Sequence, residues 1–241
     1  MKKLWIILSW LVTLLVPVVL VLGAVRIVLN QWYLDFEYHT PGFPEESYGF
    51  TLQDRLTYSR IALDYLLNDA GIEFLGDLRF PQGVQVPEPS CSYMDDCTFM
   101  YNQRELKHML DVKVVVQAAL HVWEWSIVVM AVLGLWAWRS HGMDEFLRGL
   151  SRGGLLTLIL IAVILALVLT AFSVFFVFFH NLFFAEGTWL FFFSDTLIRL
   201  FPQRFWRDTF LTVGGLTVVM ALLVWWAARK IRPETSFRGT E

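Results

Sequence analysis

Residues 102–113 read NQRELKHMLDVK, and this polar stretch runs without a break into an apolar one, residues 114–138. The apolar stretch is long enough for a membrane helix, because a hydrocarbon core of roughly 30 Å needs about 20 helical residues. The sequence thus places a charged, histidine-bearing helix turn where a spanning helix meets water. Glu105, His108 and Asp111 follow one another at a spacing of three, so on a helix they lie along one side. We expect chemistry at this helix end.

Three further apolar stretches, residues 4–25, 153–179 and 210–228, are also long enough to cross a bilayer. A spanning segment must satisfy its backbone polar groups internally, so each is predicted to be a helix. With 56% hydrophobic and 17% charged residues, the composition excludes an ordinary soluble protein. The predicted fold is mainly all-α: a four-helix transmembrane bundle with a small extracytoplasmic domain between helices 1 and 2.

Lysine and arginine residues predict the orientation, because short cytoplasmic segments carry an excess of them. They gather before the first span, between the second and third, and after the fourth: Lys2, Lys3, Arg139, Arg148, Arg152, Arg229, Lys230, Arg232 and Arg238. Both termini are therefore predicted to be cytoplasmic. The predicted segments are helices at 1–25, 112–138, 153–179 and 209–228, an extracytoplasmic domain at 26–111, a cytoplasmic loop at 139–152, an extracytoplasmic interfacial loop at 180–208 and a cytoplasmic tail at 229–241.

The first span has the basic start and apolar run of a signal peptide, but its apolar part is longer than a usual signal core, so we interpret it as a retained anchor. Residues 51–68 have helical apolar spacing, and Gly71 is a plausible stop. Residues 76–90 fit one or two short strands or an extended loop. Net charge is −3 and no basic stripe is visible, so we expect no nucleic-acid partner.

Cys91 and Cys97 both fall in the first outer segment, with five residues between them. An even pair in an oxidising compartment indicates a disulfide that closes a small loop. Two free thiols or a weak metal pair are the alternatives.

Polar residues also enter the second span, where Lys113, Gln117, His121 and Glu124 form one helical stripe. Polar groups at membrane depth are costly, so this stripe should face other helices or a wet cavity. It fits either satisfied hydrogen bonds between helices or a carrier for a small molecule or protons.

His180 ends the third apolar stretch and is followed by an unusually apolar outer loop, which is typical of a segment embedded among headgroups. Within it, Ser194 and Asp195 can cap a short helix at 196–201. Arg204 and Arg207, interleaved with tryptophan, are candidates for binding phosphate headgroups or a lipidated substrate. Ordinary snorkelling at a helix end is an equally good interpretation.

Two histidines at the outer ends of two spans can serve one acid–base site, because imidazole titrates near neutral pH. Asp111 or Glu105 could orient the His108 ring, as a carboxylate orients a catalytic imidazole. A structural role for both histidines is the alternative. The sequence shows no phosphate-cradling loop and no zinc-binding His-Glu-x-x-His pattern, so no metal or cofactor is expected.

Two blocks resemble a family of bacterial membrane proteins that includes the lipoprotein intramolecular transacylases. The first is RELKHMLDVK at 104–113; the second is FHNLFF at 179–184, followed by Trp189 and by LIRLFP at 197–202. The resemblance implies a four-span protein of the bacterial cytoplasmic membrane with its active site on the extracytoplasmic side. Its two key histidines carry over onto His108 and His180. Residues predicted to support them are Glu105, Asp111, Lys113, Asn181 and Trp189.

The reaction that the resemblance implies is an acyl shift within a bacterial lipoprotein. The sn-2 acyl chain of a diacylglyceryl-cysteine moves to the α-amino group of the same cysteine, which gives the lyso-form lipoprotein. The implied partners are the diacylglyceryl-modified N-terminus of a lipoprotein and membrane lipid, without a cofactor.

The chain departs from the family pattern at the Cys91–Cys97 loop, which resembles an insertion, and at His121 and Glu124, which have no counterpart in it. Two other classes of function therefore stay open: a small-molecule or proton-coupled membrane carrier, and a non-catalytic membrane assembly or receptor subunit. Oligomeric state, acyl-chain preference and the role of each histidine are also left open.

Overall fold

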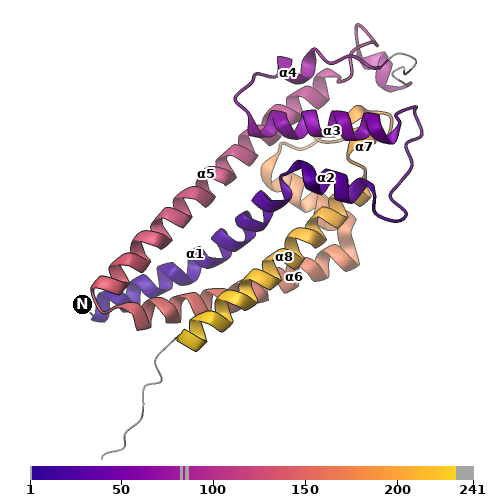
Figure 1. The fold of residues 1–241 in the computed structure, drawn as a ribbon. Coiled ribbons are helices and arrows are strands. Elements are labelled where there is room, and N and C mark those ends of the chain that lie inside the picture. The colour runs from indigo at the N-terminus through magenta and orange to yellow at the C-terminus, as the bar shows by residue number, and fades with distance from the viewer. Residues whose placement is uncertain (1, 82–83, 85–86, 232–241) are drawn as a thin grey trace, which may run out of the picture. The chain divides into compact units, whose positions relative to one another are not determined.

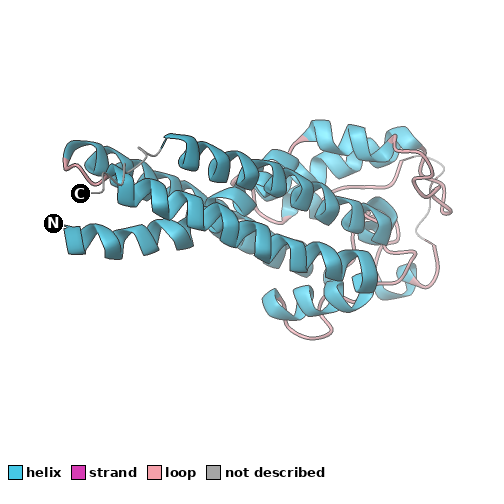
Figure 2. Cartoon of the chain, turned by 90° about the horizontal axis from the view of Figure 1, so that it is seen from below, coloured by secondary structure: helices cyan, strands magenta, loops and turns pink. Residues whose placement is uncertain are grey.

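The computed structural model describes residues 2–81, 84 and 87–231, and its regular elements over this part of the chain are helices joined by loops (Figures 1 and 2). Four of them are long: α1 (Lys2–Val28), α5 (Gln103–Arg139), α6 (Met143–Phe183) and α8 (Gln203–Ile231). Each is long and apolar enough to cross a membrane. The predicted all-α class and the four spans are therefore confirmed. Most of the predicted tail, including Arg232 and Arg238, lies outside the described residues.

The helices are longer than the predicted spans. α5 begins with the polar turn and continues through the apolar stretch, because Asn102 caps it and nothing before Arg139 interrupts it. α6 begins at Met143, so only residues 140–142 of the predicted loop at 139–152 are non-helical. Inside α6, Ala171 has non-helical angles, φ −146° and ψ 46°.

The described part of the chain also contains five shorter helices: α2 (Gln31–Tyr38), α3 (Leu52–Leu67), α4 (Glu73–Gly76), the 3₁₀ helix η1 (Ser90–Tyr93) and α7 (Thr196–Leu200). The start of α3 is fixed by a capping box, in which Thr51 and Asp54 satisfy each other's backbone amides. Residues 76–90 were expected to form one or two short strands or an extended loop, and the described residues there form the loop, with an isolated bridge between Arg79 and Phe99 in place of a strand.

The chain folds into two compact units. Unit 1 comprises Met1–Val25, His121–Ala166 and Thr212–Glu241, and unit 2 comprises Arg26–Leu120 and Leu167–Leu211. Unit 2 therefore contains more than the segment between the first two spans, since the first part of α5, the end of α6 and α7 belong to it as well.

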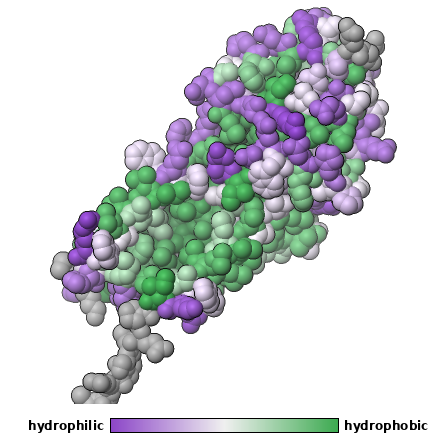
Figure 3. Space-filling view, viewed as in Figure 1, coloured by the Kyte–Doolittle hydropathy of each residue, from purple (hydrophilic) through white to green (hydrophobic). Residues whose placement is uncertain are grey.

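Unit 1 is packed through glycines that let its helices approach closely. A Cβ on Gly149 would lie 2.6 Å from the Ser9 carbonyl oxygen, and one on Gly153 would lie 2.5 Å from Cβ of Val16. Small residues four apart are a common device for membrane helix pairs, which have no hydrophobic driving force of their own in lipid. Hydrophobic residues cover most of the visible surface of this unit in Figure 3, as a lipid environment requires.

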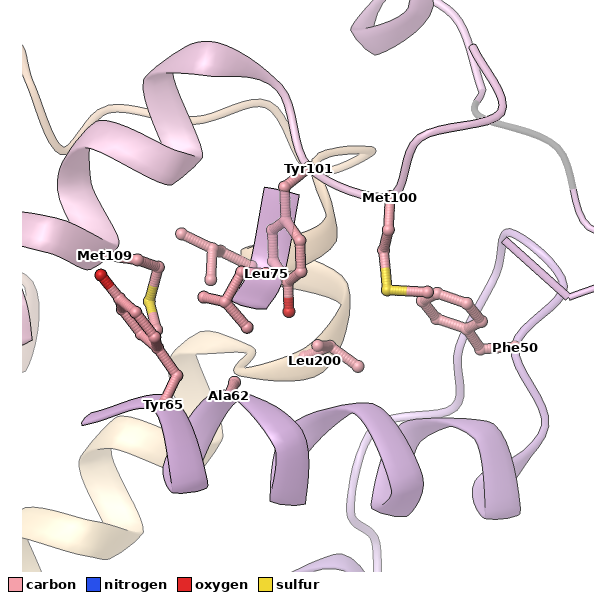
Figure 4. Packing of buried hydrophobic residues seen from close by; sticks show 9 residues of the cluster. Phe50, Ala62, Tyr65, Leu75, Met100, Tyr101, Met109 and Leu200 are labelled. Carbon is pink, nitrogen blue, oxygen red and sulfur yellow. The ribbon is translucent and has the colours of Figure 1, made fainter. Parts of the chain in front are cut away.

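Unit 2 has its own hydrophobic core, to which α3, α4, α5 and α7 each contribute. Tyr65 and Leu75 are fully buried in it, and Figure 4 shows the ring of Tyr65, from α3, next to Met109 of α5. A buried ion pair between Arg199 and Glu46, 2.7 Å apart, ties the loop before α3 to α7. This core fixes α5 and α7 against each other, and these are the elements that carry the site described next.

Candidate active site

The two histidines that the sequence singles out lie side by side in unit 2. His108 comes from the first part of α5 and His180 from the end of α6. Their rings are stacked at an interplanar angle of 22°, with 6.1 Å between centroids. A single small group placed beside the pair can therefore contact both imidazoles.

A backbone hydrogen bond holds the ring of His180 and fixes its tautomer. Nδ1 lies 2.9 Å from the carbonyl oxygen of Phe176, one helical turn earlier on α6. Because a carbonyl oxygen only accepts, Nδ1 must donate its proton there, so Nε2 of the neutral ring carries a free lone pair. His180 is thus arranged to accept a proton through Nε2.

Aromatic rings surround His180. Phe176 and Trp189 lie closest, with ring centroids 4.0 Å and 4.8 Å from the imidazole. Nε1 of Trp189 donates a hydrogen bond to Oδ1 of Asn181 at 3.2 Å. Asn181 therefore positions the tryptophan that covers His180, and the structure brings both of these predicted supporting residues to the site.

His108 is the more buried of the two, with 7% of its surface exposed. Its ring contacts Phe184 at 4.9 Å and Phe191 at 5.4 Å between centroids. Its Nδ1 is buried and has no hydrogen-bond partner in the described part of the chain. A buried polar atom without a partner is costly and is common where a substrate binds.

Glu105, predicted to orient the His108 ring, makes no hydrogen bond to it within the described residues, and each of its carboxylate oxygens accepts from a backbone amide. Oε2 accepts from the amide of Asn102 at 2.9 Å and Oε1 from the amide of Leu197 at 2.8 Å. Oδ1 of Asn102 in turn accepts from the amide of Glu105 at 3.0 Å. The pair forms a capping box that starts α5, and the second oxygen caps α7.

Asp195 is the second buried carboxylate at this place, beside Glu105 and Asn102. The sequence assigned it only a helix-capping role. Its carboxylate is fully buried and accepts from the Asn102 side chain at 3.0 Å and the Phe192 amide at 2.8 Å. Arg104 lies 3.4 Å away. Asp195 thus holds the loop that carries Phe191 against the helix that carries His108. The only signal in the sequence was the position of Asp195 just before α7.

Asp111 and Lys113, the remaining predicted supporting residues, make no hydrogen bond to His108 within the described residues. Nζ of Lys113 instead donates to the Ala70 carbonyl oxygen at 2.6 Å and to the Asn68 side chain at 3.2 Å. It also lies 4.1 Å from the centroid of the Tyr65 ring. Lys113 therefore secures the segment after α3 to α5 and does not reach the histidines.

The candidate substrate-binding arginines are occupied by contacts within the protein. Arg204 donates to the carbonyl oxygens of Pro41 and Gly42 and, at 3.0 Å, to the carboxylate of Asp208. Nε of Arg207 donates to the other oxygen of Asp208 at 3.0 Å. The structure thus gives Arg204 a fold-stabilising role, while Arg207, with 48% of its side chain exposed, stays available to solvent or lipid.

The stripe along the second span is divided between two environments. Gln117, like Lys113, bonds to the segment after α3, with Nε2 3.0 Å from the Asn68 carbonyl oxygen. His121 and Glu124 belong to unit 1 and are exposed on the surface of the chain. The two halves therefore do not form a continuous polar path inside unit 2.

Cys91 and Cys97 are joined by a disulfide, with 5.3 Å between their Cα atoms. The loop that they close includes the end of η1 and lies against the loop of Phe192, since the rings of Tyr93 and Phe192 are 5.6 Å apart. Buried Ser90 and Ser194 add a hydrogen bond of 2.7 Å between their hydroxyls. This loop thus packs against the segment that carries Phe191 and Phe192.

The arrangement suits acid–base chemistry at an apolar place. A neutral imidazole acceptor, a second imidazole and a shell of aromatic rings can move a proton while keeping water away. Among the described residues, no group of three or more His, Cys, Asp or Glu side chains is placed to hold a metal ion.

Residues 10–206 match the family model of the lipoprotein intramolecular transacylase Lit. An uncharacterized protein of Aquifex aeolicus is 28% identical over 199 residues, which is 83% of this chain and 82% of that protein.

Solved structures of the membrane-integral transacylase Lit from Bacillus cereus share the fold. One has a TM-score of 0.70 at 18% identity, covering 92% of this chain and 95% of that one. A variant with one histidine replaced by arginine has a TM-score of 0.63 at 18% identity, covering 92% and 91%. With four apolar helices and membrane-integral relatives of the same fold, the chain is a multi-pass membrane protein. Since the family model matches most of its length, the chain belongs to the lipoprotein intramolecular transacylase (Lit) family.

Proposed function

We propose that this protein transfers the sn-2 acyl chain of a diacylglyceryl-cysteine lipoprotein to the α-amino group of the same cysteine, with His108 and His180 as the catalytic residues. The observation that carries the proposal is the stacked pair of imidazoles, 6.1 Å apart, inside an aromatic shell. We propose that the site lies on the extracytoplasmic side of a bacterial cytoplasmic membrane. The distribution of lysine and arginine residues between the spans supports this orientation.

The reaction is an isomerisation and needs no co-reactant. The amine nitrogen bonds to the carbonyl carbon of the sn-2 ester, and the bond from that carbon to the glycerol oxygen breaks. The nitrogen loses one proton and the glycerol oxygen gains one, which leaves an amide, a free hydroxyl and the S-monoacylglyceryl group.

We assign His180 as the base, because its Nδ1–H is engaged by the Phe176 carbonyl oxygen and its Nε2 lone pair is free. The imidazolium that forms can then protonate the departing glycerol oxygen. We assign His108, whose ring centroid lies 6.1 Å from that of His180, to stabilise the ester oxygen through an imidazole N–H as that oxygen gains charge. Exclusion of water by Phe184, Phe191 and Trp189 favours transfer to the amine over hydrolysis.

The test is expression in a bacterial host that lacks N-acylation of its lipoproteins, followed by mass spectrometry of a reporter's N-terminal lipopeptide. The wild type should produce the lyso-form. His108→Ala and His180→Ala should each abolish it, whereas the matched control His39→Ala, at an exposed histidine, should not. Normal product from a stably expressed double variant at His108 and His180 would contradict the assignment.

A further inference from the structure

We propose that Arg104, Tyr93 and Phe192 form a subsite that binds the peptide main chain of the lipoprotein substrate next to its modified cysteine. The inference rests on the proposed function and adds to it the part of the substrate that is not lipid. The three residues come from three segments: the start of α5, η1 and the loop before α7.

The Arg104 guanidinium lies against two neighbouring aromatic rings, whose centroids are 5.6 Å apart. Its central carbon lies 5.0 Å from the ring centroid of Tyr93 and 5.1 Å from that of Phe192. Arginine stacks well on aromatic faces while its hydrogen-bond donors point outward in the plane of the group. The rings therefore fix the position of the guanidinium without using its donors.

Most of those donors are free. Nη2 lies 3.4 Å from Asp195, and this is the only hydrogen bond that the Arg104 side chain makes within the described residues. The side chain is 42% exposed. An arginine presents five N–H donors, so several can reach an external acceptor.

The position of Arg104 relative to His108 indicates which part of the substrate it meets. The two residues are one turn apart on α5, which corresponds to a rise of about 6 Å. The apolar stretch of α5 follows His108, so Arg104 lies on the opposite side of His108 from that stretch. When the acyl chains lie toward the apolar stretch and the reacting amine lies at the histidines, the peptide has to leave past Arg104.

The spacing also selects the acceptor. An extended peptide advances about 3.3 Å per residue, so 6 Å spans about two residues. The carbonyl oxygens of the modified cysteine and of the residue after it are therefore within reach of the guanidinium. Carbonyl oxygens are present in every peptide, so this subsite would bind lipoproteins irrespective of their side chains.

The disulfide loop gives the subsite its rigidity. Tyr93 lies within the loop closed by the Cys91–Cys97 disulfide. The hydroxyl of Ser90 is hydrogen-bonded to that of Ser194, two residues after Phe192. The segments that carry Tyr93 and Phe192, the two rings in contact with the guanidinium, are thereby held together.

The experiment compares two substrates with purified protein in detergent micelles. One is a diacylglyceryl-cysteine tripeptide amide; the other is the diacylglyceryl thioether of cysteamine, which has the same amine and esters but no peptide and so no peptide carbonyl oxygen. We expect Arg104→Ala to lower kcat/KM for the lipopeptide about 10- to 100-fold, the range for a lost hydrogen bond to a charged group. Conversion of the cysteamine compound should stay within about twofold of wild type, as should both substrates with the charge-matched control Lys107→Ala.

The outcomes separate this inference from the proposed function. An equal loss on both substrates, or on neither, overturns the subsite while leaving the acyl shift in place. If the loss instead follows the content of anionic phospholipid when the protein is placed in vesicles, Arg104 binds lipid headgroups and the inference is wrong. If the wild type converts neither compound, the proposed function fails, and the subsite with it.

Discussion

Glu105 on α5 accepts a hydrogen bond from the backbone amide of Leu197 on α7, 92 positions later in the chain, with 2.8 Å between Oε1 and N. The same carboxylate caps its own helix through the Asn102 amide. One buried side chain therefore satisfies two helix starts, each of which would otherwise leave amides unpaired. Since α5 carries His108 and the loop before α7 carries Phe191, this link helps set the geometry of the site.

Replacing Glu105 should be strongly destabilising. Glu105→Ala leaves two buried amides without acceptors, and each such group costs about 1–3 kcal/mol. We expect a loss of about 2–5 kcal/mol in the free energy of unfolding, measured by thermal unfolding in detergent. Asp111→Ala, on the same helix but without a hydrogen bond to the site, should have a much smaller effect. Equal effects of the two changes would contradict the capping role.

The bond between Trp189 and Asn181 should be visible as coupling in activity. Trp189→Phe and Asn181→Ala each remove the same hydrogen bond, so each should lower the rate about fivefold, the equivalent of about 1 kcal/mol. The double variant should be hardly slower than either single one, because the shared interaction is lost only once. Initial rates with the lipopeptide substrate measure this. Additive losses would show that Asn181 does not act through the tryptophan.

The polar stripe of the second span offers a test against a carrier. His121 and Glu124 are exposed, so His121→Ala and Glu124→Ala should leave acyl transfer within about twofold of wild type. Lys113→Met should act on stability, because the ammonium group loses its bonds to Ala70 and Asn68. Unfolding midpoints and lipopeptide analysis of the three variants distinguish the two effects. Loss of acyl transfer in the first two, with stability retained, would contradict this prediction, because it would give the stripe a part in the reaction.

Glu37 on α2 should make stability depend on pH. It is 1% exposed, and burial together with the neighbouring Asp208 carboxylate raises its pKa from 4.5 to about 7. The folded state therefore favours the protonated form of Glu37. The stability that this protonated side chain adds to the fold is fully present below about pH 4.5 and is lost as the pH rises through 7. We expect Glu37→Gln to be more stable than wild type at pH 8 and similar to it at pH 5.

The matched control for this prediction is Asp69→Asn, which removes one exposed carboxylate. Its unfolding midpoint should follow that of the wild type at both pH values. A Glu37→Gln variant with the same pH dependence as wild type would contradict the assigned pKa.

The sequence predicts the helices well because the information is local. A continuous apolar run is enough to predict each span, and apolar spacing with a stop at Gly71 predicts α3 almost to its ends, Leu52–Leu67. For 76–90 the sequence left short strands and an extended loop open, and the described residues form the loop with one isolated bridge. Short apolar runs carry too little periodicity to separate these cases.

The site was only partly predictable, because its contacts join distant segments. The family blocks indicated His108 and His180, and the structure places them together. No spacing rule, however, connects Glu105 to Leu197, or Asp195 to Asn102. A carboxylate one turn from a histidine suggests a catalytic role from the sequence alone. The structure shows that the Glu105 carboxylate accepts hydrogen bonds from two backbone amides instead.

The interruption of α6 at Ala171 has a consequence for the surrounding bilayer. A spanning helix adapts to a thicker or thinner membrane by tilting. A tilt of a straight helix would carry His180 with it, whereas a helix broken before Phe172 can bend at that joint. We therefore expect the part of α6 before Ala171 to change its tilt in response to hydrophobic mismatch while the part that carries His180 keeps its position. Turnover should then stay constant in vesicles made from lipids of different chain length.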